Sequence, residues 1–340
     1  MRNALTYVTR RCPRNCDYCA IRDSIGLGPE LTPKKWIDAF KVLKRMKVNF
    51  NLILGNEAWL LGWDIPFIFE RNEVPYAIYT TAPRYLFERY RHAFIIDGAI
   101  DNFSCGIDYP YSAENLPAED SVRKSREAWR AFKWVKEKRP DIDTQGTVTI
   151  HKKNYKYLPQ LIRDLSRIRV FSGVNFIHWN KDHKYDFFPR KSQIRDLCFI
   201  PSDYDDLRRV LNETLAIKNS RLQNPEMLRE PIYKLVEMGW HCAGDPYGGP
   251  TIDADGSLRV CGYRKGTHTS QFTIFDLPKK EKQWQEAVYA DAMECPGCMW
   301  SYPWMYRYWK MRNEDLGSKV FIKHAGEHIE TKNWSKRKNE

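Results

Sequence analysis

From Leu5 to about Ile177, short apolar runs alternate with longer amphipathic segments. The apolar runs have the length and composition of buried strands, and they cover residues 5–9, 50–55, 75–81, 101–107, 146–151 and 174–179. The amphipathic segments have apolar residues at helical spacing, and they cover residues 32–46, 63–72, 84–93, 121–139 and 158–168. Thr32 and Pro33 suit the N-cap and the first position of the first helix. Strands that alternate with helices predict a parallel sheet built from βα units.

The number of these units indicates an open barrel. Six units in about 180 residues are too few for a closed barrel of eight. We therefore expect an α/β fold with a partial (β/α)6 barrel. Functional residues in such sheets gather at the C-terminal ends of the strands. A further amphipathic segment at 201–219 predicts a helix that links the barrel to the rest of the chain.

The amino-acid composition of the chain changes from about Trp240 onward. The stretch that follows is rich in Gly, Asp and Pro, which is typical of hairpins and turns rather than helices. We expect residues 1–234 to form the barrel with its linker helix and residues 235–315 to form a small second domain. Residues 316–340 are polar and basic, and they predict a loosely held tail.

Composition narrows the class of protein. The chain has 340 residues with 42% hydrophobic content, and no stretch approaches the roughly 20 apolar residues of a membrane span. The N-terminal residues lack the apolar region of a signal peptide. We therefore expect a cytoplasmic protein (in the host cytoplasm if it is viral), in which cysteines serve as metal ligands rather than disulfides. Of the nine cysteines, Cys105 and Cys198 stand alone, and the other seven fall into two groups. The net charge of +12 serves solubility or an anionic partner, nucleic acid above all.

Three cysteines follow the first predicted strand. Cys12, Cys16 and Cys19 have the spacing C-x3-C-x2-C. A zinc site needs a fourth ligand, and no Cys or His follows until His92, although a distant residue could supply one. An iron–sulfur cluster held by three thiolates instead leaves one iron open to a further ligand.

This spacing, with Tyr18 directly before the third cysteine, resembles the motif of the radical S-adenosylmethionine (radical SAM) superfamily. The resemblance implies a partial barrel of six strands with a [4Fe–4S] cluster on Cys12, Cys16 and Cys19. The amine and carboxylate of SAM would bind the open iron. An electron from a low-potential donor such as flavodoxin or ferredoxin would cleave SAM to methionine and a 5′-deoxyadenosyl radical. That radical abstracts a hydrogen atom from the substrate, while the protein supplies position and excludes water.

The family also has a Gly-Gly-Glu segment after the second strand, which binds the methionine amine of SAM. In this chain the strand continues as "ILGNEAW", so that Gly55 and Glu57 match. Asn56 replaces the second glycine, and the proline that usually follows is missing. Glu57 would pair with the cationic amine, or it is simply an acid at a strand end.

Other positions implied by the resemblance follow the later strands. Ser104 and Asp108 come at the end of the fourth predicted strand and would bind the ribose or carboxylate of SAM. Tyr18 lies within the cysteine motif and is a further SAM-binding candidate. His178 at the end of the sixth strand would lie near the adenine, or it is a buried core histidine. The sequence assigns no catalytic acid or base.

A second group of cysteines lies in the turn-rich region. Its members have the spacings C-x18-C and C-x2-C, and they are Cys242, Cys261, Cys295 and Cys298. Four thiolates form a closed site for zinc or for a fully ligated cluster. With Gly256 the first pair reads C-x13-G-x4-C, which resembles the twitch extension, a shortened SPASM domain. The resemblance implies a second, auxiliary [4Fe–4S] cluster, with zinc as the alternative.

Two features bear on the substrate. Residues 123–139 carry eight positive charges against two negative, and Ala128, Phe132 and Val135 would face the barrel. The charges would form a solvated face or a surface for nucleic acid. After the last cysteine, aromatic residues alternate with other residues and could stack on bases or form a core; they are Trp300, Tyr302, Trp304, Tyr306 and Tyr308.

We therefore predict a radical SAM enzyme. The favoured version resembles the bacteriophage isomerases that rearrange an amino acid on thymine in DNA from nitrogen to carbon attachment. The chain begins in the first predicted strand, so we expect no leader-peptide module; DNA or a modified nucleotide suits this layout. The alternatives are a dehydrogenase or peptide-maturing enzyme that uses the auxiliary cluster as an electron acceptor, and a zinc-stabilised nucleic-acid-binding protein. The sequence does not indicate an oligomeric state.

Overall fold

The computed structural model describes residues 2–19, 25–54, 56–62, 76–97, 100, 102–111, 116, 119–177, 196–223, 225–229, 249–262 and 265–294. Several sequence predictions lie outside these ranges: the helix at 63–72, the SAM-binding candidates Gly55 and His178, the cysteines Cys242, Cys295 and Cys298, the aromatic run 300–308 and the tail 316–340.

Strands and helices alternate through the first half of the chain. The elements of this half are β1 (Arg2–Tyr7), α1 (Pro33–Arg45), β2 (Val48–Leu54), η2 (Ala58–Leu61), β3 (Tyr76–Thr80), α3 (Arg84–Arg91), the π-helical η3 (His92–Ile96), β4 (Asn102–Gly106), α4 (Asp120–Lys138), β5 (Asp143–Ile150), η4 (Tyr155–Tyr157), α5 (Leu158–Arg167) and β6 (Phe171–Phe176). Thr32 caps α1 as predicted, because its side chain accepts a hydrogen bond from the amide of Lys35.

The remaining elements are shorter on average. They are η5 (Pro201–Asp203), α7 (Tyr204–Leu215), α8 (Glu226–Arg229), β7 (Thr251–Ile252), β8 (Leu258–Arg259), η6 (Thr269–Gln271) and α10 (Leu277–Met293). The predicted linker helix corresponds to η5 and α7. Within the described residues, no helix combines the length and the apolar character needed to cross a membrane.

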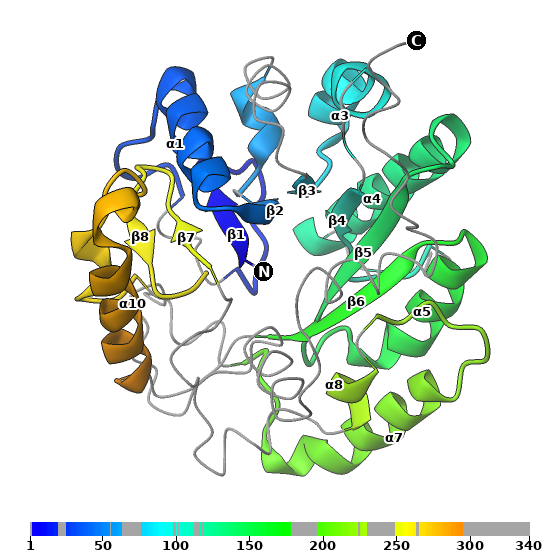
Figure 1. The fold of residues 1–340 in the computed structure, drawn as a ribbon. Coiled ribbons are helices and arrows are strands. Elements are labelled where there is room, and N and C mark those ends of the chain that lie inside the picture. Colours follow the sequence, from blue (N-terminus) through cyan, green and yellow to red (C-terminus); the bar gives the residue numbers. More distant parts are fainter. Residues whose placement is uncertain are drawn as a thin grey trace.

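The eight strands form one sheet in the order β6-β5-β4-β3-β2-β1-β7-β8. Each neighbouring pair from β1 to β6 is parallel. The helices α1, α3, α4 and α5 lie along the outer side of the curved sheet (Figure 1). The prediction of a parallel α/β sheet is thus confirmed, and the arrangement is consistent with a partial barrel. Because all six strands point the same way, their C-terminal ends meet at one edge of the sheet.

The β7–β8 hairpin extends this sheet beyond β1. Leu5 pairs with Thr251 and Thr6 pairs with Ile252 in parallel register, and β8 then runs antiparallel to β7. The hairpin covers the edge of β1 and satisfies backbone groups there that would otherwise be unpaired. The small second domain at residues 235–315 and its boundary stay a prediction. The β7–β8 hairpin within that range continues the barrel sheet.

Helix α4 packs on the sheet as its apolar periodicity predicts. Ala128, Phe132 and Val135 are fully buried, which confirms the face assigned to them. Arg123, Arg126, Arg130 and Lys133 are exposed. One charged residue departs from this pattern, because Lys124 is buried at the start of the helix.

An aromatic cluster fills the space between η2 and the helices beside it. Trp59 is fully buried and stacks on Phe87 of α3 at 5.5 Å and on Phe94 of η3 at 5.0 Å between ring centroids. Phe103 of β4 lies 6.3 Å from the same ring. Trp59 therefore fixes the loop after β2 against the third and fourth βα units.

Replacing Trp59 by alanine should destabilise the protein strongly. The substitution empties a large part of this cluster, and we expect the free energy of unfolding to fall by about 3–5 kcal/mol, measured by urea denaturation of the full chain. The matched control is Tyr85→Ala on α3, whose side chain is 57% exposed, and its effect should stay within about 0.5 kcal/mol. Equal losses from the two variants would contradict a core role for Trp59.

Candidate active site

The three cysteines of the motif lie just past the C-terminal end of β1. Cys16 is buried, and Cys12 and Cys19 are partly buried. The amide of Cys19 donates a hydrogen bond to the carbonyl of Cys16 at 3.1 Å, which closes a turn around Tyr18. Burial, together with the nearby Glu57, Cys19 and Cys16, raises the pKa of the Cys12 thiol to about 12. The structure thus gathers the three thiols where parallel sheets carry their functional residues.

These thiols fit an iron–sulfur cluster by their chemistry. Burial raises the pKa of Cys16, while the nearby Lys124 ammonium lowers it. Buried thiols stay protonated until a metal takes the place of the proton. A metal centre would therefore release protons from these cysteines, and the Lys124 charge favours the thiolate form that iron binds. Three thiol donors leave room for one outside ligand on a four-iron cluster.

A buried ion pair lies directly beneath Tyr18. The Lys124 side-chain nitrogen lies 2.5 Å from Oδ2 of Asp108, and the two residues are 2% and 1% exposed. The Tyr18 hydroxyl donates to the same carboxylate oxygen at 2.6 Å, and Lys124 also contacts that hydroxyl. The other carboxylate oxygen accepts from the amide of Thr149 at 3.2 Å. Burial alone lowers the pKa of Lys124, but its neighbours, Asp108 foremost, raise it above its ordinary value.

Sequence reasoning missed Lys124. We counted it among the charges of α4 that face outward, although it lies one helical turn before Ala128 and therefore on the buried face. Asp108 and Tyr18 were expected to contact SAM. They meet at the expected end of β4 and bond to each other and to Lys124, and their contact with SAM stays a prediction. Ser104 is buried within β4, where it pairs with Tyr79 of β3; its role toward SAM also stays a prediction.

Glu57 has structural contacts that the sequence did not predict. Its carboxylate is 0% exposed and accepts hydrogen bonds from the hydroxyls of Thr80 and Thr81 at 2.7 Å each. It also accepts from the amides of Thr81 at 2.8 Å and Trp59 at 3.3 Å, the latter as the N-cap of η2. Burial raises the pKa of Glu57, and the bonds from Thr81 and Thr80 offset part of that rise.

These four bonds use the four acceptor positions of a carboxylate. They join the loop after β2 to the end of β3. A direct contact between this carboxylate and the amine of SAM would require one of the bonds to break. The SAM-binding role of Glu57 therefore stays a prediction that competes with a structural one.

His151 is a second residue that sequence reasoning missed. It follows β5, is 2% exposed and lies 5.4 Å from the Tyr18 ring. Burial lowers the pKa of His151 to about 4, so the ring is neutral at pH 7. Its Nδ1 accepts from the amide of Lys153 at 3.2 Å, which places the proton on Nε2. Among the described residues Nε2 has no hydrogen-bond partner, and a buried donor of this kind suits a bound ligand.

The comparison of the sequence with known families decides the nature of this site. Residues 6–165 match the sequence profile of the radical SAM superfamily. This part of the chain is a radical SAM domain. Members of the superfamily are enzymes, and membership implies a [4Fe–4S] cluster and SAM. In this radical SAM domain, Cys12, Cys16 and Cys19 would hold the cluster.

Solved structures of radical SAM enzymes share the fold. SuiB of Streptococcus suis bound to S-adenosylmethionine superposes with a TM-score of 0.60 at 14% identity, over 85% of this chain and 66% of that chain. SuiB bound to the precursor peptide SuiA gives 0.59 at 14%, over 85% and 65%. The anSMEcpe enzyme with bound AdoMet and the Cp18Cys peptide gives 0.56 at 14%, over 88% and 87%. The chain thus spans about two thirds of the SuiB length, and at this identity the likeness concerns the fold. No curated protein sequence matches the chain.

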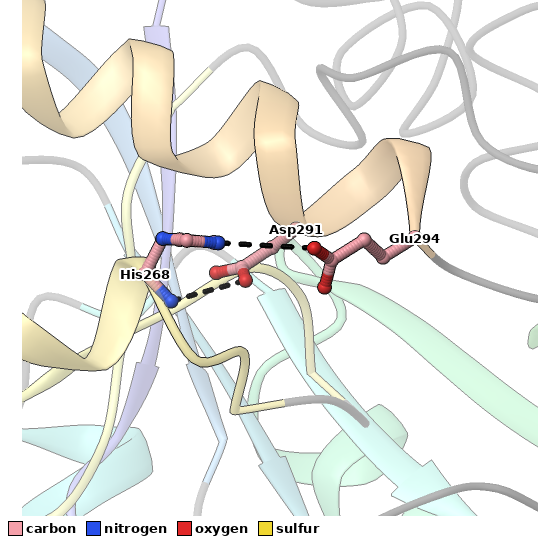
Figure 2. Close-up of side chains that lie close together, drawn as sticks. All are labelled: His268, Asp291 and Glu294. Atoms are coloured by element: carbon pink, nitrogen blue, oxygen red, sulfur yellow. Dashed lines mark hydrogen bonds and ion pairs between the residues drawn. The ribbon is translucent and has the colours of Figure 1, made fainter.

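A different cluster of ligand-type side chains lies beyond the radical SAM domain. The side chains of His268, Asp291 and Glu294 bring one potential metal-binding atom each within 4.8 Å of the others. Figure 2 shows His268 against the last turn of α10, its ring nitrogen 3.8 Å from a Glu294 oxygen. This His–Glu contact is exposed to solvent, where such pairs contribute little.

Asp291 has a structural role in this cluster. Its carboxylate accepts hydrogen bonds from the amides of Thr267 at 3.0 Å, His268 at 3.1 Å and Thr269 at 2.7 Å, and from the Thr269 hydroxyl. These four bonds hold the turn before η6 and the first residue of that helix. We therefore interpret the cluster as a structural contact, in which hydrogen bonds hold this turn against α10, rather than as a metal site.

Replacing Glu57 by glutamine separates its two possible roles. Glutamine keeps the shape but turns an amide NH2 group toward buried donors, so we expect the iron-free chain to lose about 1–3 kcal/mol of unfolding free energy in urea denaturation. Glu88→Gln is the control, because Glu88 is exposed on α3 and pairs with Arg84. If Glu57→Gln unfolded like the control but lost SAM in equilibrium dialysis, the carboxylate would be a ligand and not a structural group.

Proposed function

We propose that the protein is a radical SAM enzyme that acts on hydrogen-bearing carbon atoms of its substrate. The observation that carries this proposal is the position of Cys12, Cys16 and Cys19 at the C-terminal end of β1 in a radical SAM domain. When bound, the [4Fe–4S] cluster and SAM would supply a 5′-deoxyadenosyl radical that abstracts hydrogen from the substrate. The reducing electron comes from a separate low-potential donor such as flavodoxin or ferredoxin.

The residues of the chain hold and shield this chemistry. The Lys124 ammonium lies close enough to Cys16 to favour its thiolate. Tyr18 and Asp108 fix the cysteine loop against β4 and α4. Arg14, between the first two cysteines, donates to the carbonyl of Thr81 at 3.1 Å and pairs with a carboxylate of α4. These buried contacts limit motion of the loop that carries the cysteines, as a site with precise geometry requires.

A second iron–sulfur cluster is part of the proposal. Cys261 lies two residues after the end of β8 and is partly buried. It would act with Cys242, Cys295 and Cys298, which lie outside the described residues. The hydroxyl of Tyr7 in β1 donates to the carbonyl of Gly262 at 3.1 Å, so Cys261 lies against the barrel. Zinc is the alternative occupant, because four thiolates suit either one.

We infer DNA as the substrate class, with an amino acid on thymine rearranged from nitrogen to carbon attachment. What supports this is the cationic face of α4, which consists of Arg123, Arg126, Arg130 and Lys133. These positions lie within residues 123–133, a length of about 15 Å of helix. The face begins beside the cysteine loop, because the amide of Asn15 donates to a carboxylate oxygen of Asp120 at 2.6 Å. The cationic face could therefore hold the phosphate backbone while a base reaches the strand ends.

An exposed aromatic ring adds to this surface. Tyr111 is exposed, and the Lys133 ammonium lies 3.9 Å from the centre of its ring. Rings of this kind beside cations can stack on unpaired bases. The modified nucleotide alone is a smaller substrate that the same site could accept.

A peptide is the second candidate substrate. The SuiB and anSMEcpe structures of similar fold are described with bound peptides, which favours a peptide-maturing enzyme or dehydrogenase that passes an electron to the auxiliary cluster. A zinc-stabilised nucleic-acid-binding protein is the alternative outside enzymology. Metal analysis after anaerobic purification distinguishes this alternative from the enzyme. Two clusters would give about eight irons per chain, whereas the alternative would contain zinc alone.

SAM cleavage tests the proposed chemistry. The reconstituted wild-type chain with dithionite and SAM should release 5′-deoxyadenosine, measured by chromatography, and Cys16→Ala should reduce the yield at least a hundredfold. Cys198→Ala is the matched control, because Cys198 is buried between β6 and η5, away from the motif in sequence, and it should keep the activity. Equal yields of 5′-deoxyadenosine from the two variants would contradict the assignment of Cys16 as a cluster ligand.

Salt-dependent DNA binding tests the cationic face. Arg126→Gln, Arg130→Gln and Lys133→Gln together should lower DNA affinity at least tenfold in fluorescence anisotropy. The slope of log affinity against log salt should become about 2–3 smaller in magnitude, because each lost phosphate contact removes about 0.9. The control removes three exposed charges from α1 (Lys34, Lys41 and Lys44). If both triple variants weaken binding equally, the interaction reflects net charge and the α4 surface has no special part.

A further inference from the structure

The turn between β7 and β8 lies against the start of the segment that carries the three cysteines. Arg10, two residues before Cys12, points one guanidinium nitrogen at two carboxylates of this turn, Asp253 at 3.0 Å and Asp255 at 2.9 Å. Its other terminal nitrogen donates to the carbonyl of Leu27 at 3.1 Å. One side chain thus joins the start of the β1–α1 segment, its later part and a turn about 240 residues away.

Backbone contacts repeat the same connection. The amide of Gly26 donates to the carbonyl of Arg10 at 2.9 Å, and the amide of Leu31 donates to the carbonyl of Ala254 at 2.7 Å. The amide of Arg10 itself donates to Glu30 at 2.7 Å. The chain therefore enters and leaves the cysteine-bearing segment at neighbouring points, and the β7–β8 turn touches both.

The conformation of Gly28 adapts to this arrangement. Its φ is +89°, a left-handed value that favours glycine, and a Cβ there would overlap the guanidinium of Arg10. The segment thus bends tightly around the Arg10 side chain.

The turn has its own anchor to the barrel. Asp253 also pairs with Arg259 of β8 at 3.3 Å, and the Arg259 guanidinium lies 5.3 Å from the Tyr7 ring centre in β1. Asp255 accepts from the amide and hydroxyl of Ser257 at 2.9 and 2.6 Å. The two carboxylates are therefore held in place by contacts other than Arg10, so that they can position Arg10 rather than follow it.

We propose that Arg10 is a positioning residue, and that the β7–β8 turn sets the geometry of the cysteine loop through it. The inference rests on the proposed function in that the loop is taken to hold the cluster. A planar guanidinium can bridge two carboxylates and a carbonyl at once, whereas the compact ammonium of lysine cannot. The C-terminal hairpin thus becomes necessary for the N-terminal metal site, although it supplies none of the three cysteines.

Hydrogen exchange of the iron-free full chain tests the contact between Arg10 and the β7–β8 turn without any cofactor. The amides of Gly26 and Leu31 should exchange at least tenfold faster in Arg10→Gln than in wild type. Arg11→Gln is the matched control, since Arg11 is adjacent and exposed and its ion pair with Glu30 at 3.5 Å does not involve the β7–β8 turn, and it should leave these rates unchanged. Asp253→Asn with Asp255→Asn should reproduce the Arg10→Gln rates, and adding Arg10→Gln to them should change little more, because the three residues form one interaction.

The reconstituted chain tests the consequence for the cluster. In Arg10→Gln, iron loss to a chelator should be at least tenfold faster, and SAM should change the electron paramagnetic resonance signal of the reduced cluster less than in wild type. Arg10→Lys should restore part of both effects. Equal exchange and equal iron loss in the Arg10 and Arg11 variants would overturn the inference. A wild-type chain that takes up no iron would instead count against the proposed function. The exchange rates would still test the positioning role of Arg10.

Discussion

The candidate site depends on one buried ion pair, between Lys124 of α4 and Asp108 after β4. Moving two charges out of water costs several kcal/mol for each ion, and only good geometry with further hydrogen bonds offsets that cost. The structure supplies these bonds from the Tyr18 hydroxyl and the Thr149 amide. Losing one partner of such a pair typically costs about 3–5 kcal/mol. Tyr18, and with it the turn that joins Cys16 to Cys19, is therefore tied to the most polar point of the core.

Other buried polar groups extend this support along the strand ends. Glu57 joins the loop after β2 to Thr80 and Thr81 at the end of β3. Arg14 then reaches from the cysteine loop to the carbonyl of Thr81 and to Glu127 of α4. The loops after four successive strands thus share hydrogen bonds, each of which would be costly to leave unmade. Such a network holds the thiols in position before any metal binds, which favours rapid and selective metal binding.

Much of this fold could be predicted from local patterns. The strands and helices of the six βα units carry clear periodicity, and parallel pairing follows from their alternation. The β7–β1 pairing could not be predicted, since a two-residue strand has no periodicity and its partner lies about 245 residues away. The burial of Lys124 could have been predicted from its position on the helix, but its charge led us to expect it on the exposed face. The hydrogen-bond donors to Glu57 could not be predicted from the sequence, because Thr80 and Thr81 come close to it only when β2 and β3 lie side by side.

Strand β1 has an unusual share in the chemistry proposed for this protein. Its C-terminal end leads into Arg10 and Cys12, while Tyr7 within it bonds to the carbonyl next to Cys261. Cys12 and Cys261 therefore both take their position from the same short strand, Cys12 through the chain itself and Cys261 through side-chain and sheet contacts. A shift of β1 would displace both together and largely preserve the spacing between them. That shared origin explains how a hairpin distant in sequence could act as part of the site that the N-terminal motif forms.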